Sequence, residues 1–161
     1  MTLDSRIADF MLRFLERSGV PDIVALSERL YEPFAVGRTP QAADEGARLY
    51  LAGIKTATSS LVWEYEAEGK PLPFVGAISA LLDGRGAPVA MVETIETAIR
   101  TFDEIDEAFA RDYGEWDRTL AGWRKGCWPY YEARCRQLGR KAAGDMPLLC
   151  ERMRIVYRET E

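Results

Sequence analysis

Two stretches at the start of the chain have the hydrophobic spacing of amphipathic helices. In the first, apolar side chains recur at positions i, i+3, i+4, i+7 and i+8, namely Ile7, Phe10, Met11, Phe14 and Leu15. Residues 18–21 end this helix, and Pro21 can begin a second, shorter one with apolar positions at Ile23, Leu26 and Leu30. We therefore predict an N-terminal helical extension over residues 1–33, which packs on the rest of the chain or forms a dimer surface.

A third helical pattern is followed by a lysine among hydroxyl side chains. Thr39 and Pro40 are suited to the N-cap and the first helical position, and the pattern runs to Gly53 through Ala43, Ala47, Tyr50 and Leu51. Glycine readily adopts the left-handed conformation that ends a helix. Lys55 and Thr58 follow, so this turn can bring an amine and a hydroxyl to one pocket. The alternative is that Lys55 is a solvated surface residue and Thr58 opens a strand.

Residues 75–82 and 89–99 predict two strands of a hairpin. The sequence DGRG at residues 83–86 has the composition of the turn between them. The second strand carries Glu93 among apolar residues, where a carboxylate must find a partner or be partly desolvated. Pairing across the hairpin surface is the alternative to a role in a site.

Residues 101–109 predict a short helix, and Asp117 is a suitable N-cap for a longer helix with Trp123 on its inner face. Proline cannot continue a helix undistorted, so Pro129 predicts a break or kink near residues 126–128. The many aromatic residues of this region are more typical of a core than of a base-stacking surface.

The end of the chain has the clearest strand pattern. Met153, Ile155 and Tyr157 share one face, and the other face is rich in arginine, with Arg152, Arg154 and Arg158. Because the formal net charge is −5, we expect these arginines to pair with surface acids rather than to contact a phosphate.

Composition predicts one soluble domain that recognises a small ligand. The chain has 161 residues, of which 47% are hydrophobic and 29% charged. A net charge of −5 disfavours bulk attraction of long RNA, so any RNA contact requires a local basic patch. We find no signal peptide and no apolar run near the ~20 residues of a membrane span, and we expect a cytoplasmic protein without membrane association.

The titratable residues limit the chemistry. The chain has no histidine, so proton transfer must fall to Lys, Asp, Glu, Tyr or Cys, and histidine metal ligands are excluded. Cys127, Cys135 and Cys150 are odd in number and form no Cys-x-x-Cys pair, so we expect buried free thiols. We predict no metal site and no cofactor.

A series of short motifs extends over residues 34–158. They are FAVG at 34–37, GIKTAT at 53–58, WEYE at 63–66, PLP at 71–73, VET at 92–94, WR at 123–124 and MPLLCER at 146–152. In that order and at these distances, the chain resembles the ASCH domain family, whose fold is similar to the PUA domains of RNA-modifying proteins. The resemblance implies an α+β fold in which a small PUA-like β-barrel with flanking helices, over residues 34–161, follows the N-terminal extension.

The resemblance also implies a pocket at the barrel mouth that binds a nucleoside or a short RNA. A compact bacterial member looks like an amidohydrolase of acetylated cytidine that uses a lysine, a threonine and a glutamate. The first two carry over as Lys55 and Thr58. The glutamate belongs in the loop before the tryptophan-bearing helix, where Glu115 is the best candidate and Glu93 the next. We predict further substrate-binding residues at Gly53, Thr56, Ser59, Arg38 and Tyr50, together with Glu93.

The roles within this set stay open at the level of sequence. Thr58 can attack a carbonyl once a base removes its proton. Lys55 is that base if burial lowers its pKa, or it stays charged and stabilises an oxyanion. The glutamate either holds the lysine or carries a proton to the leaving amine.

Three departures from the family pattern bear on the reaction. Ala77 and Tyr113 stand where relatives carry acidic residues, and Cys127 stands where they often carry a histidine. For lack of that histidine we rank nucleotide cleavage below hydrolysis of an acyl amide on a cytidine-like nucleoside. The alternatives are a non-catalytic module that binds RNA or a modified base, a metal-assisted ribonuclease, and a protein–protein module that uses the N-terminal helices.

Overall fold

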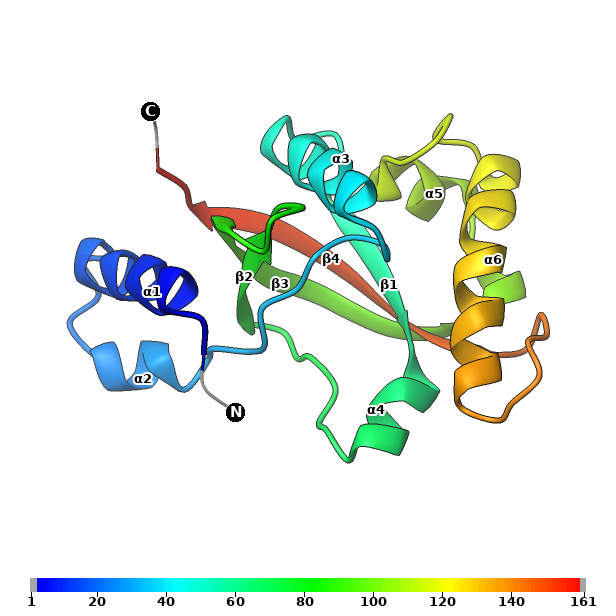
Figure 1. The fold of residues 1–161 in the computed structure, drawn as a ribbon, viewed down its shortest axis with the longest axis horizontal. Coiled ribbons are helices and arrows are strands. Elements are labelled where there is room, and N and C mark those ends of the chain that lie inside the picture. Colours follow the sequence, from blue (N-terminus) through cyan, green and yellow to red (C-terminus); the bar gives the residue numbers. More distant parts are fainter. Residues whose placement is uncertain (1–2, 160–161) are drawn as a thin grey trace.

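The computed structural model describes residues 3–159 and contains one four-stranded antiparallel sheet (Figure 1). The strands are β1 (Ala57–Leu61), β2 (Ile78–Leu82), β3 (Pro88–Thr101) and β4 (Pro147–Tyr157), in the spatial order β1-β4-β3-β2. The sheet curls into a half-barrel with helices around it, so the predicted α+β, PUA-like architecture is confirmed. The hairpin turn between β2 and β3 is also confirmed.

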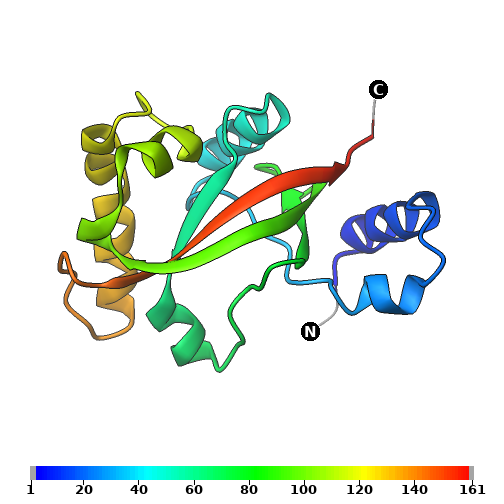
Figure 2. The same cartoon turned by 180° about the vertical axis from the view of Figure 1, so that it is seen from behind.

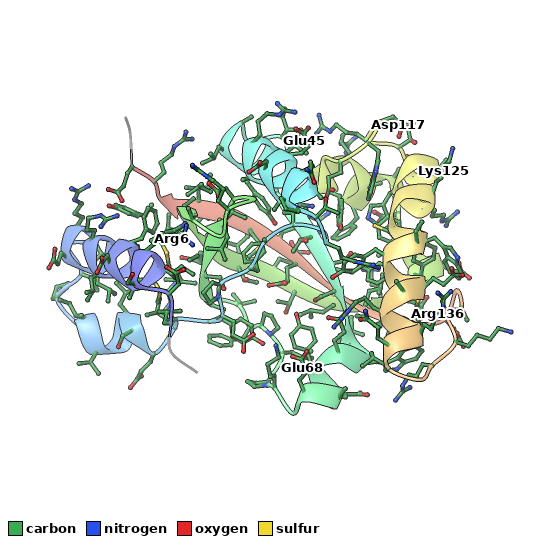
Figure 3. The ribbon with its side chains drawn as sticks, in the orientation of Figure 1. Arg6, Glu45, Glu68, Asp117, Lys125 and Arg136 are labelled. Atoms are coloured by element: carbon green, nitrogen blue, oxygen red, sulfur yellow. The ribbon has the colours of Figure 1, made fainter. Side chains whose placement is uncertain are left out.

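Six α-helices flank the sheet within the described residues. They are α1 (Ser5–Arg17), α2 (Ile23–Ser27), α3 (Pro40–Leu51), α4 (Val62–Glu68), α5 (Glu107–Tyr113) and α6 (Leu120–Gln137). In Figures 1 and 2, α1 and α2 lie at the β2 end of the sheet, and α5 and α6 lie at the opposite end. Helix α3 follows the expected amphipathic pattern, since it buries Ala43, Ala47 and Tyr50 and turns the ion pair of Glu45 and Arg48 to solvent (Figure 3).

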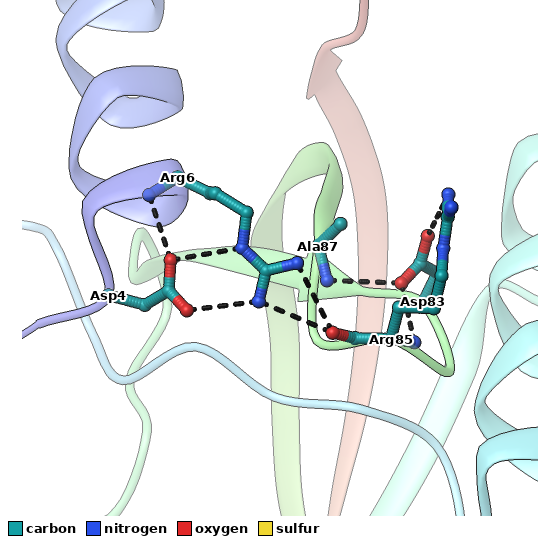
Figure 4. Close-up of polar contacts among 5 residues, drawn as sticks. All are labelled: Asp4, Arg6, Asp83, Arg85 and Ala87. Carbon is teal, nitrogen blue, oxygen red and sulfur yellow. Dashed lines mark hydrogen bonds and ion pairs between the residues drawn. The ribbon is translucent and has the colours of Figure 1, made fainter.

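The N-terminal helices pack on the sheet through an apolar cluster. Phe10 and Phe14 of α1 are buried with Ile78 of β2 and Met91 of β3. The start of α1 is also tied to the β2–β3 hairpin, because the Arg6 guanidinium donates to the carbonyl of Arg85 at 3.3 Å (Figure 4). The boundary at residues 33 and 34 and the dimer surface stay predictions. No helix within residues 3–159 has the length and apolar character needed to cross a membrane.

Helix α6 shows that the predicted break near residues 126–128 was wrong, because the helix runs without interruption from Leu120 to Gln137, and the alternative of a kink stays a prediction. Proline removes one N–H from the helical ladder. The loss is offset by packing, since four side chains at a spacing of four residues are buried along one face of the helix: Trp123, Cys127, Tyr131 and Cys135. Trp123 and Tyr131 therefore belong to the core, as predicted for the aromatic residues of this region.

Three predicted element ends are corrected by the local structure of the chain. Thr119, not Asp117, caps α6 through its hydroxyl, and the Asp117 carboxylate accepts from Thr119 instead. The predicted helix over residues 101–109 is a 3-10 turn (Phe102–Glu104) followed by α5, whose N-cap is Asp106. Strand β2 begins at Ile78 rather than at residue 75, because Gly76 has a φ of +98° that no extended strand can accommodate.

Candidate functional site

A cavity of about 410 Å³ opens between the sheet, α4, α6 and the segments at residues 31–37 and 113–116. Its floor comes from three strands, through Thr58 of β1, Ser79 of β2, and Glu151 and Met153 of β4. Thr58 and Glu151 are direct partners in the antiparallel pairing of β1 and β4. Side chains in such a position have Cβ atoms about 4.5–5.5 Å apart on the same face, so a hydroxyl and a carboxyl stand side by side at the floor.

Lys55 lies behind the cavity wall and is only 1% exposed, which excludes the reading as a solvated surface lysine. Its Nζ lies 2.9 Å from Glu115 Oε2, donates to the carbonyl of Tyr113 at 3.1 Å, and stands 3.3 Å from the centre of the Tyr113 ring. Burial lowers the pKa of Lys55, while the carboxylate of Glu115 opposes that shift. Three electron-rich groups around one amine suit an ammonium, so we assign Lys55 a positive charge.

Glu115, unlike Lys55, lines the cavity together with Thr58. The structure therefore brings the three predicted catalytic residues into one region but gives them different access. Thr58 and Glu115 line the cavity, whereas Lys55 lies outside the lining and contacts Glu115.

Gly114 explains how the loop before α6 reaches the lysine turn. Its φ is +76°, and a Cβ at this position would lie 2.6 Å from the carbonyl oxygen of Ile54 and 2.8 Å from Cα of Lys55. Only glycine allows both the left-handed conformation and this backbone approach. The close contact sets Glu115, the next residue, beside the lysine.

Aromatic side chains form much of the cavity wall. The Trp116 ring is stacked on that of Tyr113, with centroids 5.9 Å apart and planes 9° apart, and about half of Trp116 is exposed. A Cβ on Gly126 of α6 would collide with the Trp116 ring, so glycine leaves room for it. Tyr65 and Tyr130 complete the wall from α4 and α6. Flat aromatic surfaces of this kind suit stacking by a planar base.

The other predicted binding residues divide between the cavity and the surface. Ser59 lines the cavity and shares a hydrogen bond with the buried hydroxyl of Tyr131. Thr56 donates to the carbonyl of Asp112 at 3.4 Å, and Gly53 is exposed with a φ of +74°. Neither of the last two lines the cavity.

Tyr50, Arg38 and Glu93 also lie outside the cavity lining. Tyr50 is buried with its ring centre 5.7 Å from Lys55 Nζ, so it supports the lysine from behind. Arg38 is exposed, although it is near enough to Tyr130 to oppose the rise that burial causes in the pKa of that phenol. Glu93 pairs with Arg29 at 2.9 Å and with Arg154 at 3.3 Å, which favours the surface-pairing alternative.

Two of the three arginines on the outer face of the last strand pair with acids, as the sequence predicts, whereas Arg158 donates to the carbonyl of Leu51 at 3.0 Å. Arg152 lies 3.2 Å from Asp112 and 3.4 Å from Glu96, and Arg154 pairs with Glu93. All three cysteines are free and buried. Cys127 lines the cavity, but burial raises the pKa of its thiol to about 12, so the thiol is protonated and a poor nucleophile at neutral pH.

Sequence reasoning missed Glu151 as a site residue. Its side chain is buried at 6% exposure, Oε1 accepts from the Thr94 hydroxyl at 2.9 Å, and burial raises the pKa of the carboxyl above 4.5. The available signal was a carboxylate that follows three apolar residues in the motif at residues 146–152. No group of three or more Cys, Asp or Glu side chains suited to hold a metal ion occurs within residues 3–159.

Glu151→Gln is expected to gain stability relative to wild type as the pH rises above about 4.5, the ordinary pKa of a glutamate. The folded protein holds the Glu151 proton more tightly than the unfolded chain, so wild type loses stability while the pH climbs from 4.5 through the raised pKa. Glutamine keeps the acceptor for Thr94 and removes the titration. Urea unfolding from pH 4 to 8 measures the difference. The exposed Glu96→Gln is the control, and an equal trend in both variants would contradict this assignment.

Comparisons with known proteins agree with the fold and cover nearly the whole chain. A family model described as ASCH domain matches residues 32–157. The structure is similar to that of an ASCH domain from Lactobacillus crispatus JV V101, with a TM-score of 0.88 and 26% identity over 98% of both chains. Protein EF3133 from Enterococcus faecalis V583 shares the fold, with a TM-score of 0.80 and 24% identity over 94% of this chain and 88% of that one. No curated protein matches the sequence.

Proposed function

The chain belongs to the ASCH domain family, and we propose that its cavity binds a nucleoside or the end of a short RNA and hydrolyses an acyl amide on a cytidine-like base. The observation that carries this proposal is the position of Thr58 and Glu115 at one cavity, with Glu115 held by a buried lysine. The cavity volume of about 410 Å³ falls within the ~300–1,000 Å³ of typical small-molecule sites, so a nucleoside fits the site in size.

The proposed reaction proceeds through an acyl-threonine. The Thr58 oxygen attacks the acyl carbonyl carbon, and the carboxylate of Glu115 takes the hydroxyl proton. As the C–N bond breaks, that proton passes to the exocyclic nitrogen, which leaves as the amine of the free base. Water then attacks the ester, gives its proton to Glu115, and releases a carboxylic acid while the threonine oxygen regains the proton.

Lys55 is the positioning residue in this scheme. Its ammonium, 2.9 Å from Glu115 Oε2, fixes the orientation of the carboxylate that accepts the proton. The lysine has no place in the cavity lining, so we do not assign it the role of base.

The proposal is tested by incubating the protein with a panel of acylated cytidines and measuring free cytidine by mass spectrometry. We expect wild type to release cytidine and Thr58→Val to lose about 10²-fold or more of the rate, because valine has the shape of threonine but no hydroxyl. Thr97→Val is the matched control, since Thr97 lies on β3 outside the cavity, and it should keep the wild-type rate. Absence of turnover by wild type at high enzyme concentration would overturn the amidohydrolase.

The second candidate is a non-catalytic module that binds RNA or a modified base in the same cavity. The half-exposed Trp116 on its stacking partner Tyr113 favours this reading, because it offers a base a flat surface that no chemical step requires. Binding of nucleosides without turnover would support it.

A further inference from the structure

The charged side chains that line the cavity are mostly acidic. They comprise five carboxylates and one ammonium: Glu32, Glu64, Glu68, Glu115, Glu151 and Lys70. Lys70 Nζ lies 2.8 Å from Glu32 and 2.5 Å from Glu68, which extends from the end of α4 (Figure 3). Two further pairs, each at 2.9 Å, join Glu64 with Arg134 and Glu115 with Lys55.

Glu151 is the carboxylate that remains without a basic partner within residues 3–159. More than nine-tenths of the residue is buried, and the one hydrogen bond of its side chain among the described residues comes from Thr94 to Oε1. Among the described residues no hydrogen bond reaches Oε2, and Glu151 is part of the cavity lining. A buried carboxylate in this state is costly unless a cation or a set of N–H donors reaches it.

Aromatic residues line the cavity together with the unpaired carboxylate. The cavity lining includes six aromatic residues, Tyr31, Phe34, Tyr65, Tyr113, Trp116 and Tyr130. The faces of such rings carry partial negative charge and attract cations, most strongly where water is excluded. Aromatic rings and carboxylates thus favour the same kind of ligand, and both repel a phosphate.

We propose that the cavity selects a nucleoside whose base carries one positive charge, such as a cytidine or adenosine methylated at a ring nitrogen, with Glu151 as the counter-ion and the aromatic wall around the base. One unpaired carboxylate matches one positive charge. The proposal rests on the proposed function only in taking the ligand to be a nucleoside. It adds the charge of the ligand and the residue that recognises it. Because the acidic lining excludes a 5′-phosphate, it also favours a free nucleoside over the end of an RNA.

The test measures binding of three probes to wild type by calorimetry: cytidine, 3-methylcytidine, which is cationic at neutral pH, and cytidine 5′-monophosphate. We expect 3-methylcytidine to bind at least about tenfold more tightly than cytidine, and the monophosphate to bind more weakly than either. Glu151→Gln should bring the affinities of the two nucleosides within about twofold of each other. Glutamine retains the Thr94 hydrogen bond, and Glu96→Gln, on an exposed site outside the cavity, should keep the wild-type preference.

The outcomes separate this inference from the proposed function. If wild type binds cytidine as tightly as 3-methylcytidine, or if Glu151→Gln keeps the full preference for the cation, the inference is wrong while nucleoside binding stands. If no nucleoside binds, both the proposed function and the inference fall. Circular dichroism of Glu151→Gln verifies folding. If that variant is unfolded, Thr94→Val removes the hydrogen bond that orients the carboxyl and should reduce the preference for the cation, and an unchanged preference would again contradict the inference.

Discussion

Lys55→Met is expected to lower the free energy of unfolding by about 3–5 kcal/mol, the range found when one partner of a buried ion pair is removed. Methionine fills much of the lysine volume but leaves the carboxylate of Glu115 without its cation and the carbonyl of Tyr113 without its donor. It also ends the contact of the ammonium with the Tyr113 ring. Urea unfolding followed by circular dichroism at pH 7 measures the loss.

Two further variants distinguish the contribution of the ion pair to the free energy of unfolding from the contribution of packing. In Lys55→Met combined with Glu115→Gln no charge is left unpaired, so the double variant should be more stable than Lys55→Met alone. Lys70→Met is the surface control, because Lys70 pairs with Glu32 and Glu68 in water and should contribute about 1 kcal/mol or less. If Lys55→Met and Lys70→Met lowered the free energy of unfolding equally, the buried ion pair would contribute no more to stability than the surface one.

The elements with clear periodicity could be predicted from the sequence, since their burial follows directly from the repeat. This holds for α1, for α3 with its Thr39 cap and for the two strands of the hairpin. The ends of the helices and strands were predicted less accurately. Pro129 shows why, because a local rule against proline is overridden where a helix face is fully buried in the core.

The site could be predicted only in part. Lys55 and Thr58 lie only three residues apart in the sequence, and the family resemblance, now confirmed, identified both as candidates for the site. The burial of Lys55 could not be predicted, because it depends on Tyr113, which lies 58 residues further along the chain. Glu151 was missed for a similar reason, since its neighbour Thr94 comes from a different strand and the cavity walls come from segments far apart in sequence.

The division of access between Lys55 and Glu115 leads to the second large effect. Glu115→Gln is expected to reduce kcat for acylated cytidines by about 10²–10⁴-fold, the usual contribution of a general base. Glutamine retains an oxygen for the Lys55 ammonium and the shape of the wall, but it cannot take the proton of Thr58. KM should change little, because the aromatic wall remains. Mass spectrometry of released cytidine gives both constants.

This pattern distinguishes the hydrolase from its alternatives. Glu96→Gln, which removes a carboxylate from the exposed edge of β3, should keep the wild-type kcat. A rise in KM with unchanged kcat in Glu115→Gln would mean that Glu115 only binds the ligand. The proton would then have to pass to Glu151, the residue that pairs with Thr58 across β1 and β4. Loss of kcat in Glu115→Gln but not in Thr58→Val would instead point to direct attack by water, activated by the carboxylate that Lys55 holds in place.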